Sequence, residues 1–493
     1  MYDISEAIQN LQHALQLTPD GAAGLLNNLG TSFSIRFEHT GDLHDLSEGI
    51  RHQQRAVRFL PDGHVKLPGM LGNLGTSLSL RFAHTGEIHD ISEAIGHQHH
   101  AVQLTPDGND RLPMRLDNLG TSFRHRFERN RDMHDILEAI KYQQRAVDFT
   151  PDCHADLPRR LSSLGNSFIR RFEHTRDYKF LFPAASNFRL SATSTAGVPL
   201  VRLRAAETWV MILEQPHFSS SETELLEAHA RIIQLLFLIS GVENTIQRRH
   251  ETLVGASQLS LAASAAALSL GHPDKALEWL VEGRCIVWNQ INQLRTPIDE
   301  LRSYDPALAD RLSNLSRELE NAGLRTDLRS KQTGLSMDDK ISLEDEARTH
   351  LKHARDWEKH LNTIRNIPQF KDFLRPRKCA DIMDNLPEEG PVVIINIHSN
   401  HCGALALIAG AGGPLHIPLP NFSYREAERL ANGLHDFLLS LGVRSPRAMQ
   451  CFNDSPVSSV DFPAVLKVLW SDVVRPILDA LSFSVCFPSS FQP

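Results

Sequence analysis

A short run of histidine and cysteine is the strongest candidate for chemistry in this 493-residue sequence. The run reads HSNHC and contains His398, His401 and Cys402. Imidazole nitrogens and thiolates bind transition metals, and a thiolate beside an imidazole is an activated nucleophile. No carboxylate with ligand spacing adjoins the run, which follows a predicted strand. We interpret it as an ordinary strand connection and expect no metal site, with metal binding or nucleophilic catalysis as the weaker alternative.

Histidine is also abundant elsewhere, with 25 residues in the chain. Several recur in loops of the type EHTGDLHD, at His39, His44, His84, His89, His134 and His174. A ladder of imidazoles could bind metal or respond to pH. The interpretation that we favour is turn chemistry, in which Asp and Gly shape each loop.

Asparagine recurs at one position of an internal repeat. Asn28, Asn73 and Asn118 each precede a Leu-Gly pair, and Ser163 takes this place in a fourth cycle. An asparagine amide both donates and accepts hydrogen bonds, so it can bind the backbone of an extended peptide. The pattern predicts a peptide-binding groove along these residues, and a role in packing or capping fits it equally well.

The elements that would position these side chains are repeated every 45 residues. Leu-Gly pairs begin at Leu29, Leu74, Leu119 and Leu164, and Arg-Phe pairs begin at Arg36, Arg81, Arg126 and Arg171. Four cycles in step leave little room for chance. Because such units cannot bury their apolar faces alone, they must stack on one another.

Each cycle predicts two helices. The first carries an apolar stripe from Leu71 to Phe82. The second spans Asp90–Asp107, with Asp90 as its predicted N-cap and Glu93 three residues later, as in a capping box. Small residues such as Gly75 would let neighbouring helices approach closely. An unpaired second helix, Asp3–Leu17, precedes the first full cycle.

Composition excludes several classes of protein. Lys and Arg number 51 against 59 Asp and Glu, a net charge of −8, which gives no electrostatic footprint for nucleic acid. Hydrophobic residues make up 41%, but no run is long enough to span a membrane. The six cysteines show no CxxC pairing and the N-terminus does not resemble a signal peptide, so we expect a reducing compartment, the cytosol or the nucleus. No cofactor motif is present.

The rest of the chain changes character twice. Residues 179–366 predict irregular helices, with a flexible stretch at about 325–340. The apolar β-branched run Val392–Ile397 predicts a buried strand, and two further short strands follow. Helices are then predicted at Tyr424–Leu441 and Phe462–Leu481. This order is that of the opening of an α/β domain.

Two resemblances fit this layout. The spacing from Leu-Gly through Ala94 and Ala101 to Pro106 resembles the tetratricopeptide repeat (TPR), in a long form common in fungal proteins. The ordered motifs GHPDKALEWLVEGRCIVWNQ, GPVVIINI and LWSDVVRPILDAL are similar to fungal proteins in which such repeats precede a CHAT domain, a caspase- and separase-like fold. The resemblance implies a mainly α chain: a TPR-like superhelical solenoid over 1–178, irregular TPR-like helices over 179–366, and a truncated α/β CHAT domain over 367–493.

The resemblance also implies a function. Active CHAT proteins would be cysteine peptidases with a His–Cys dyad that lies after the helix starting at Trp470. No histidine follows Trp470, and Cys486 is the only cysteine there, so we assign no catalytic residue. We expect a non-catalytic scaffold that binds a protein or peptide in the TPR groove, without cofactor, nucleic acid or membrane, and that self-associates through an unpaired sheet edge. The alternative is a fragment of a CHAT-family cysteine peptidase whose catalytic half lies beyond residue 493. A third, weaker hypothesis is a metal enzyme built on HSNHC.

Overall fold

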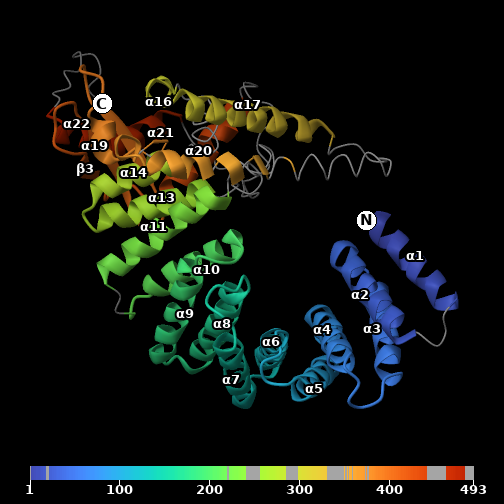
Figure 1. Ribbon diagram of the computed structural model, residues 1–493. Helices are drawn as coiled ribbons and strands as arrows, with labels where there is room; N and C mark the ends of the chain where they lie inside the picture. The colour runs from blue at the N-terminus through green and yellow to red at the C-terminus, as the bar shows by residue number, and fades with distance from the viewer. Residues whose placement is uncertain are drawn as a thin grey trace. The chain divides into compact units, whose positions relative to one another are not determined.

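The chain is mainly helical and carries one small antiparallel sheet (Figure 1). The computed structural model describes residues 2–17, 22–218, 221–239, 256–284, 298–329, 349, 352–353, 355–357, 359–371, 373–374, 377–440 and 462–482. These residues form two compact units, residues 1–220 and 221–493.

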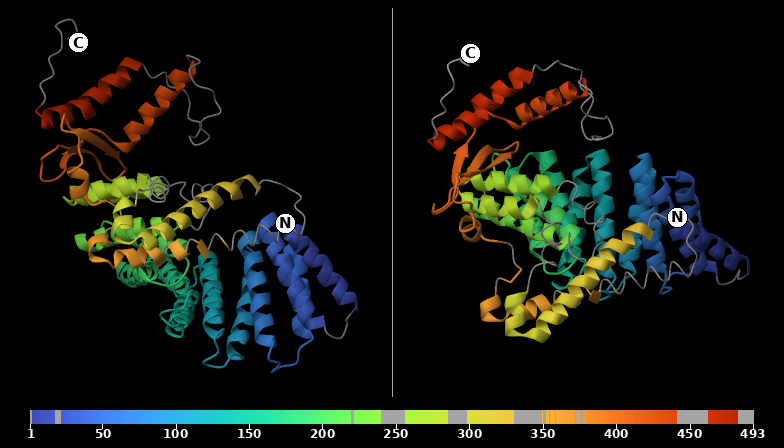
Figure 2. Two further views of the ribbon diagram at one scale, coloured as in Figure 1. Left: turned by 45° about the horizontal axis from the view of Figure 1, so that its top comes forward. Right: turned by 90° about the horizontal axis from the view of Figure 1, so that it is seen from above.

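The first unit consists of helices, most of them in consecutive antiparallel pairs. They are α1 (Tyr2–Leu17), α2 (Ala22–Thr40), α3 (Leu43–Arg58), α4 (Leu67–Thr85), α5 (Ile88–Gln103), α6 (Leu112–Asn130), α7 (Met133–Asp148), α8 (Leu157–Thr175), the 3₁₀ turn η2 (Tyr178–Phe180), α9 (Leu181–Thr193) and α10 (Pro199–Leu213). The Leu-Gly pairs lie on α2, α4, α6 and α8, so each 45-residue cycle is one pair of helices. The helices of successive pairs stand side by side (Figure 2).

Glycine allows the two helices of a pair to pack closely. A Cβ at Gly75 would lie 2.5 Å from Cγ of Gln98 and 3.0 Å from the carbonyl oxygen of Ala94, both on the partner helix. Such contacts are too short for real atoms, so only glycine fits. Gly30, one cycle earlier, approaches Gln53 in the same way, and Gly120, one cycle later, approaches Gln143. The predicted role of Gly75 is confirmed.

A buried ion pair fixes the connection between the helices of a pair. Nη2 of Arg81 lies 2.6 Å from Oδ1 of Asp90, and its Nε lies 2.7 Å from Oδ2. Arg36 pairs with Asp45, and Arg126 with Asp135, in the same two-bonded way. Bidentate charged hydrogen bonds are among the strongest that side chains make.

The prediction that Asp90 is an N-cap is therefore wrong. Helix α5 begins at Ile88 with Glu87 as its N-cap, three residues before Asp90, and Asp90 is 5% exposed inside the first turn. An Asp with a Glu three residues later matches a capping box. Here the Arg nine residues before Asp90 takes the carboxylate instead.

The second unit combines helices with the sheet. Its elements are α11 (Glu222–Ile239), α13 (Ala256–Ser269), α14 (Pro273–Arg284), α16 (Asp299–Tyr304), α17 (Pro306–Arg329), η3 (Pro368–Phe370), α19 (Cys379–Met383), β1 (Val392–Ile397), β2 (Cys402–Leu407), β3 (Leu415–Pro418), α20 (Tyr424–Ser440), α21 (Phe462–Leu469), the π-helical turn η5 (Trp470–Val474) and α22 (Arg475–Ala480). The strands and α20 lie close to where the sequence predicts them, and the predicted helix Phe462–Leu481 is divided into α21, η5 and α22.

The sheet has the order β1-β2-β3 with both pairs antiparallel. Cys402, Ala404 and Ala406 face a cluster that includes residues of α20, α21 and α22. Asn396, on the other face, donates from Nδ2 to the carbonyl of Leu261 on α13 at 3.1 Å. Figure 2 shows helices on both sides of the strands.

The predicted buried strand is an outer strand instead. Every residue of β2 is buried, whereas Val392 and Val393 of β1 are 37% and 36% exposed. The strand was correctly predicted but its burial was not, because a β-branched run indicates extended structure and does not say how many neighbours the strand has.

Two further expectations concern the middle of the chain. Residues 325–329 of the predicted flexible stretch belong to α17, so that part of the prediction is wrong, and residues 330–340 lie outside the described residues. The apolar helix faces of the sequence also predict Trp209, Trp279 and Trp288 as core residues. Trp209 and Trp279 are buried, and Trp288 lies outside the described residues. Among the described helices, none has both the length and the apolar character needed to cross a bilayer.

Candidate binding groove

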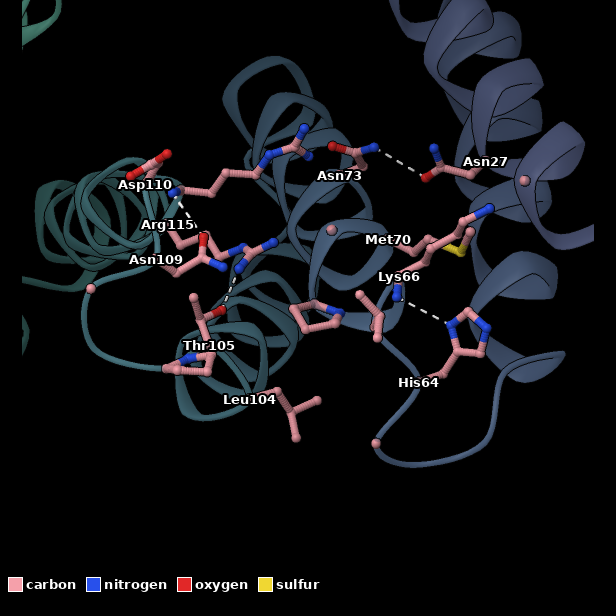
Figure 3. A pocket seen from close by; sticks show the side chains of 18 of the residues that line it. Asn27, His64, Lys66, Met70, Asn73, Leu104, Thr105, Asn109, Asp110 and Arg115 are labelled. Atoms are coloured by element: carbon pink, nitrogen blue, oxygen red, sulfur yellow. Dashed lines mark hydrogen bonds between the residues drawn. The ribbon is translucent and has the colours of Figure 1, made fainter.

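Two adjoining cavities lie over helices α2, α4 and α6. The larger has a volume of about 1020 Å³ and the smaller about 360 Å³. Gly69, Asn73, Arg111 and Arg115 line both, so the cavities form one depression. We call this depression the groove. Figure 3 shows its larger part, with side chains from all three helices around the space.

The three predicted asparagines all line the groove. Asn28 lies at the larger cavity, Asn118 at the smaller, and Asn73 at both. The amides of Asn28 and Asn73 are exposed and that of Asn118 is half-buried. The structure thus brings the three residues to one surface, because each sits at the same position of successive helices.

Asn27 is a neighbour that the sequence pattern did not single out. Nδ2 of Asn73 donates to Oδ1 of Asn27 at 3.1 Å, across α2 and α4 (Figure 3). Hydroxyls make similar bridges between these first helices, from Ser34 to Ser77 and from Ser79 to Ser122. These bonds hold neighbouring helices in register, so the amides keep a regular spacing. The packing role that the pattern left open is therefore present alongside the exposed amides.

Two buried glutamines also line the smaller cavity. Gln53 and Gln98 are 1% and 3% exposed, and the Oε1 atom of each has no hydrogen-bond partner among the described residues. An unsatisfied buried acceptor is costly, since the group has lost its water. Both oxygens are shielded from the cavity, and the two side chains pack against Gly30 and Gly75 of the partner helices. Their signal in the sequence is the recurrence of glutamine at 53, 98 and 143, in step with the cycles.

Arg115 is a further residue that the sequence prediction missed. Its side chain is buried, and Nη1 donates to Oγ1 of Thr105 (Figure 3). Burial and the charge of Arg111 lower the pKa of its guanidinium. Among the described residues no carboxylate forms an ion pair with it. The signal was available by comparing cycles, because Leu60 and Met70 occupy the equivalent positions one cycle earlier.

The HSNHC residues do not come together as one site. The Sγ of Cys402 lies in the core below the sheet and donates to the carbonyl of His398 at 3.4 Å. His401 instead lies beside His416 of β3, with their Nε2 atoms 3.1 Å apart. Burial lowers the pKa of both imidazoles. In a hydrogen bond between the two Nε2 atoms, one ring carries the N–H and the other accepts. Within the described part of the chain, no three His, Cys, Asp or Glu side chains are placed to hold a metal ion.

The loop histidines are spread over the surface of the first unit. His84 packs its ring edge-on against Phe37 at 4.7 Å between centroids, and His174 does so against Phe127 at 5.5 Å. Each imidazole thus contacts the pair of helices before its own. These contacts fit the interpretation of the loops as structural elements of the repeat.

Comparison with known proteins adds no assignment. No family model matches the chain, and a search of curated proteins finds no match. The groove's chemistry is therefore the guide to function. It combines exposed amides with cations, which suits binding of a polar, extended ligand.

Proposed function

We propose that this protein is a non-catalytic binding scaffold, built on TPR-like helical repeats, whose groove holds an extended segment of a partner protein. The observation that carries the proposal is the line of Asn28, Asn73 and Asn118 along the groove. Each amide offers one donor group and one acceptor, which matches the alternating N–H and C=O groups of an extended backbone.

The size and the walls of the groove support a peptide ligand. A volume of about 1020 Å³ is at the upper end for a small-molecule pocket and accommodates several residues of an extended chain. The bridges between Asn27 and Asn73 and between serines prearrange the walls. A prearranged surface loses little entropy on binding.

The proposal includes the resemblance of residues 367–493 to the first part of a CHAT domain. The three-stranded sheet with helices on both faces is compatible with such a region. In this proposal the second unit is part of the scaffold and does not act as a peptidase.

The test uses a displayed library of random peptides, selected on the full chain. The variant Asn28→Ala/Asn73→Ala/Asn118→Ala should bind the selected peptides at least tenfold more weakly, since lost hydrogen bonds are worth about 1 kcal/mol each. Gln144→Ala is the matched control, because Gln144 is an exposed amide on α7 that donates to Asp148 and does not line the groove in the described part of the chain. Equal binding by the triple variant and the wild type would overturn the proposal.

A further inference from the structure

An arginine and a threonine form the same buried hydrogen bond in two cycles, but among the described residues the arginine has an acidic partner in only one of them. In the fourth cycle, Arg160 donates to Oγ1 of Thr150 and also forms an ion pair with Asp156, with Nη2 and Oδ2 3.3 Å apart. In the third cycle, Arg115 donates to Thr105 in the same way, but Arg111 stands where Asp156 would be. Arg115 therefore has the positive charge of Arg111 at the position where Arg160 has the carboxylate of Asp156.

The charge of Arg115 is directed at the groove. Arg115 is 8% exposed, and it lines both cavities. A Cβ added at Gly69 would be 4.0 Å from its Nη2, so the absence of a side chain on α4 leaves room in front of the guanidinium. A buried guanidinium without an acid is costly unless a ligand supplies one.

The surroundings strengthen the positive potential. Lys66, Arg111 and Arg115 line the larger cavity, where Asp110 is the only acid among the described lining residues; Glu38 lines the smaller cavity. Helices α4 and α6 begin at this cavity, and neither N-cap residue makes a side-chain capping bond. The positive ends of two helix dipoles thus add to the three side-chain cations.

We infer that Arg115 is the anchor of an oxyanion site, which binds a carboxylate or phosphate group on an acidic segment of the partner protein. This inference rests on the proposed function and adds the chemistry of the ligand. The cavity is much larger than a free anion, so the group belongs to a larger ligand. The described residues of its lining include no Phe, Tyr or Trp on which a nucleobase could stack, whereas the amides of Asn28 and Asn73 suit a peptide backbone.

The preceding and following cycles provide the variants for a test. Thr105→Leu/Arg115→Met installs the residues of the second cycle, where Leu60 and Met70 pack in one apolar cluster, so this variant should fold. Arg111→Asp installs the acid of the fourth cycle at an exposed position and gives Arg115 an internal partner. Thr150→Leu/Arg160→Met is the matched control, because it makes the same change where the charge is already balanced.

The probes are three fluorescent hexapeptides. One is Glu₆, one is Gln₆, and the third is Gln₆ with one glutamine replaced by phosphoserine. Binding to the full chain is measured by fluorescence anisotropy at low salt. We expect at least one of the two acidic probes, Glu₆ or the phosphoserine peptide, to bind with at least tenfold higher affinity than Gln₆. Both test variants should lose at least tenfold in affinity for the acidic probe, and the control variant should not. Which acidic probe binds identifies carboxylate or phosphate as the preferred group.

Equal binding of acidic and neutral probes, or unchanged acidic binding by both test variants, would overturn the oxyanion site. That failure is distinct from failure of the proposed function. Neutral peptides selected from the library could still bind through the asparagines, and Asn28→Ala/Asn73→Ala/Asn118→Ala would still reduce that binding.

Discussion

At the scale of single residues, His229 is an imidazole buried under unusual conditions. It lies on α11, is 2% exposed, and neither ring nitrogen has a hydrogen-bond partner among the described residues. Burial, together with the charge of His398, lowers its pKa to about 4. The neutral ring packs against Trp279, with centroids 6.3 Å apart. Proton uptake by this residue therefore opposes folding.

The pH dependence of stability follows from that pKa. The unfolded chain takes up the proton near pH 6.5 and the folded chain only near 4, so stability is present above 6.5 and is lost as the pH falls toward 4. Between pH 7 and 5 this amounts to about 2 kcal/mol. We expect His229→Phe to remove about that much of the difference in unfolding free energy between the two pH values, measured by urea denaturation.

The control for this experiment is His44→Phe, which changes an exposed ring in the first unit. It should leave the pH dependence as in the wild type. An unchanged pH dependence in His229→Phe would show that other groups cause the loss of stability in acid.

At the scale of elements, substitutions at two glycines of α4 can test why the helices of a pair pack so closely. Gly75 faces Gln98 and Ala94, whereas a Cβ at Gly72 would meet nothing within 4 Å. We expect Gly75→Ala to destabilise the fold by about 1–3 kcal/mol through overpacking. Gly72→Ala should stabilise it by up to about 1 kcal/mol, since alanine favours the helix. Thermal unfolding followed by circular dichroism measures both, and a gain in stability from Gly75→Ala would contradict the packing argument.

Comparison of cycles explains what the sequence could predict at this scale. Helix pairs were predictable because Leu-Gly and the apolar stripe recur every 45 residues. The asparagines were predictable as a surface line for the same reason. The role of Asp90 was not, because a local capping pattern and a pairing with Arg81 use the same residue types. Arg115 was missed because its meaning lies in a difference between cycles, and a search for repeats emphasises what is shared.

The burial of β1 shows a different limit. Its residues predict a strand through their own shape, but neighbours decide how much of it is covered. Likewise, His401 was grouped with His398 and Cys402 by proximity in sequence. Its ring instead meets that of His416, 15 residues away, over Gly403, where a Cβ would lie 2.9 Å from Nε2 of His416 and 3.2 Å from Nε2 of His401.

At the scale of the whole molecule, self-association through the sheet edge stays a prediction. Val392 and Val393 leave apolar surface on an outer strand, where natural proteins often place lysine to prevent pairing between chains. We expect the average mass of the wild type in sedimentation equilibrium to rise above 55.3 kDa with concentration. Val393→Lys should stay at that mass, because a charge on the strand opposes pairing.

Val198→Lys provides the comparison, since Val198 is 60% exposed but precedes a helix of the first unit. It should associate like the wild type. A wild type that stays monomeric at all concentrations would refute the expectation.

The 45-residue repeat also affects how the first unit folds. The side-chain bonds that join successive helix pairs, such as Ser34–Ser77, Asn27–Asn73 and Arg159–Asp117, connect residues 42 to 46 apart. No long loop has to close before such contacts form, which favours fast folding. During synthesis, each new pair of helices can dock on the pair already made before the next one leaves the ribosome. We therefore expect this unit to assemble in order from its N-terminal end.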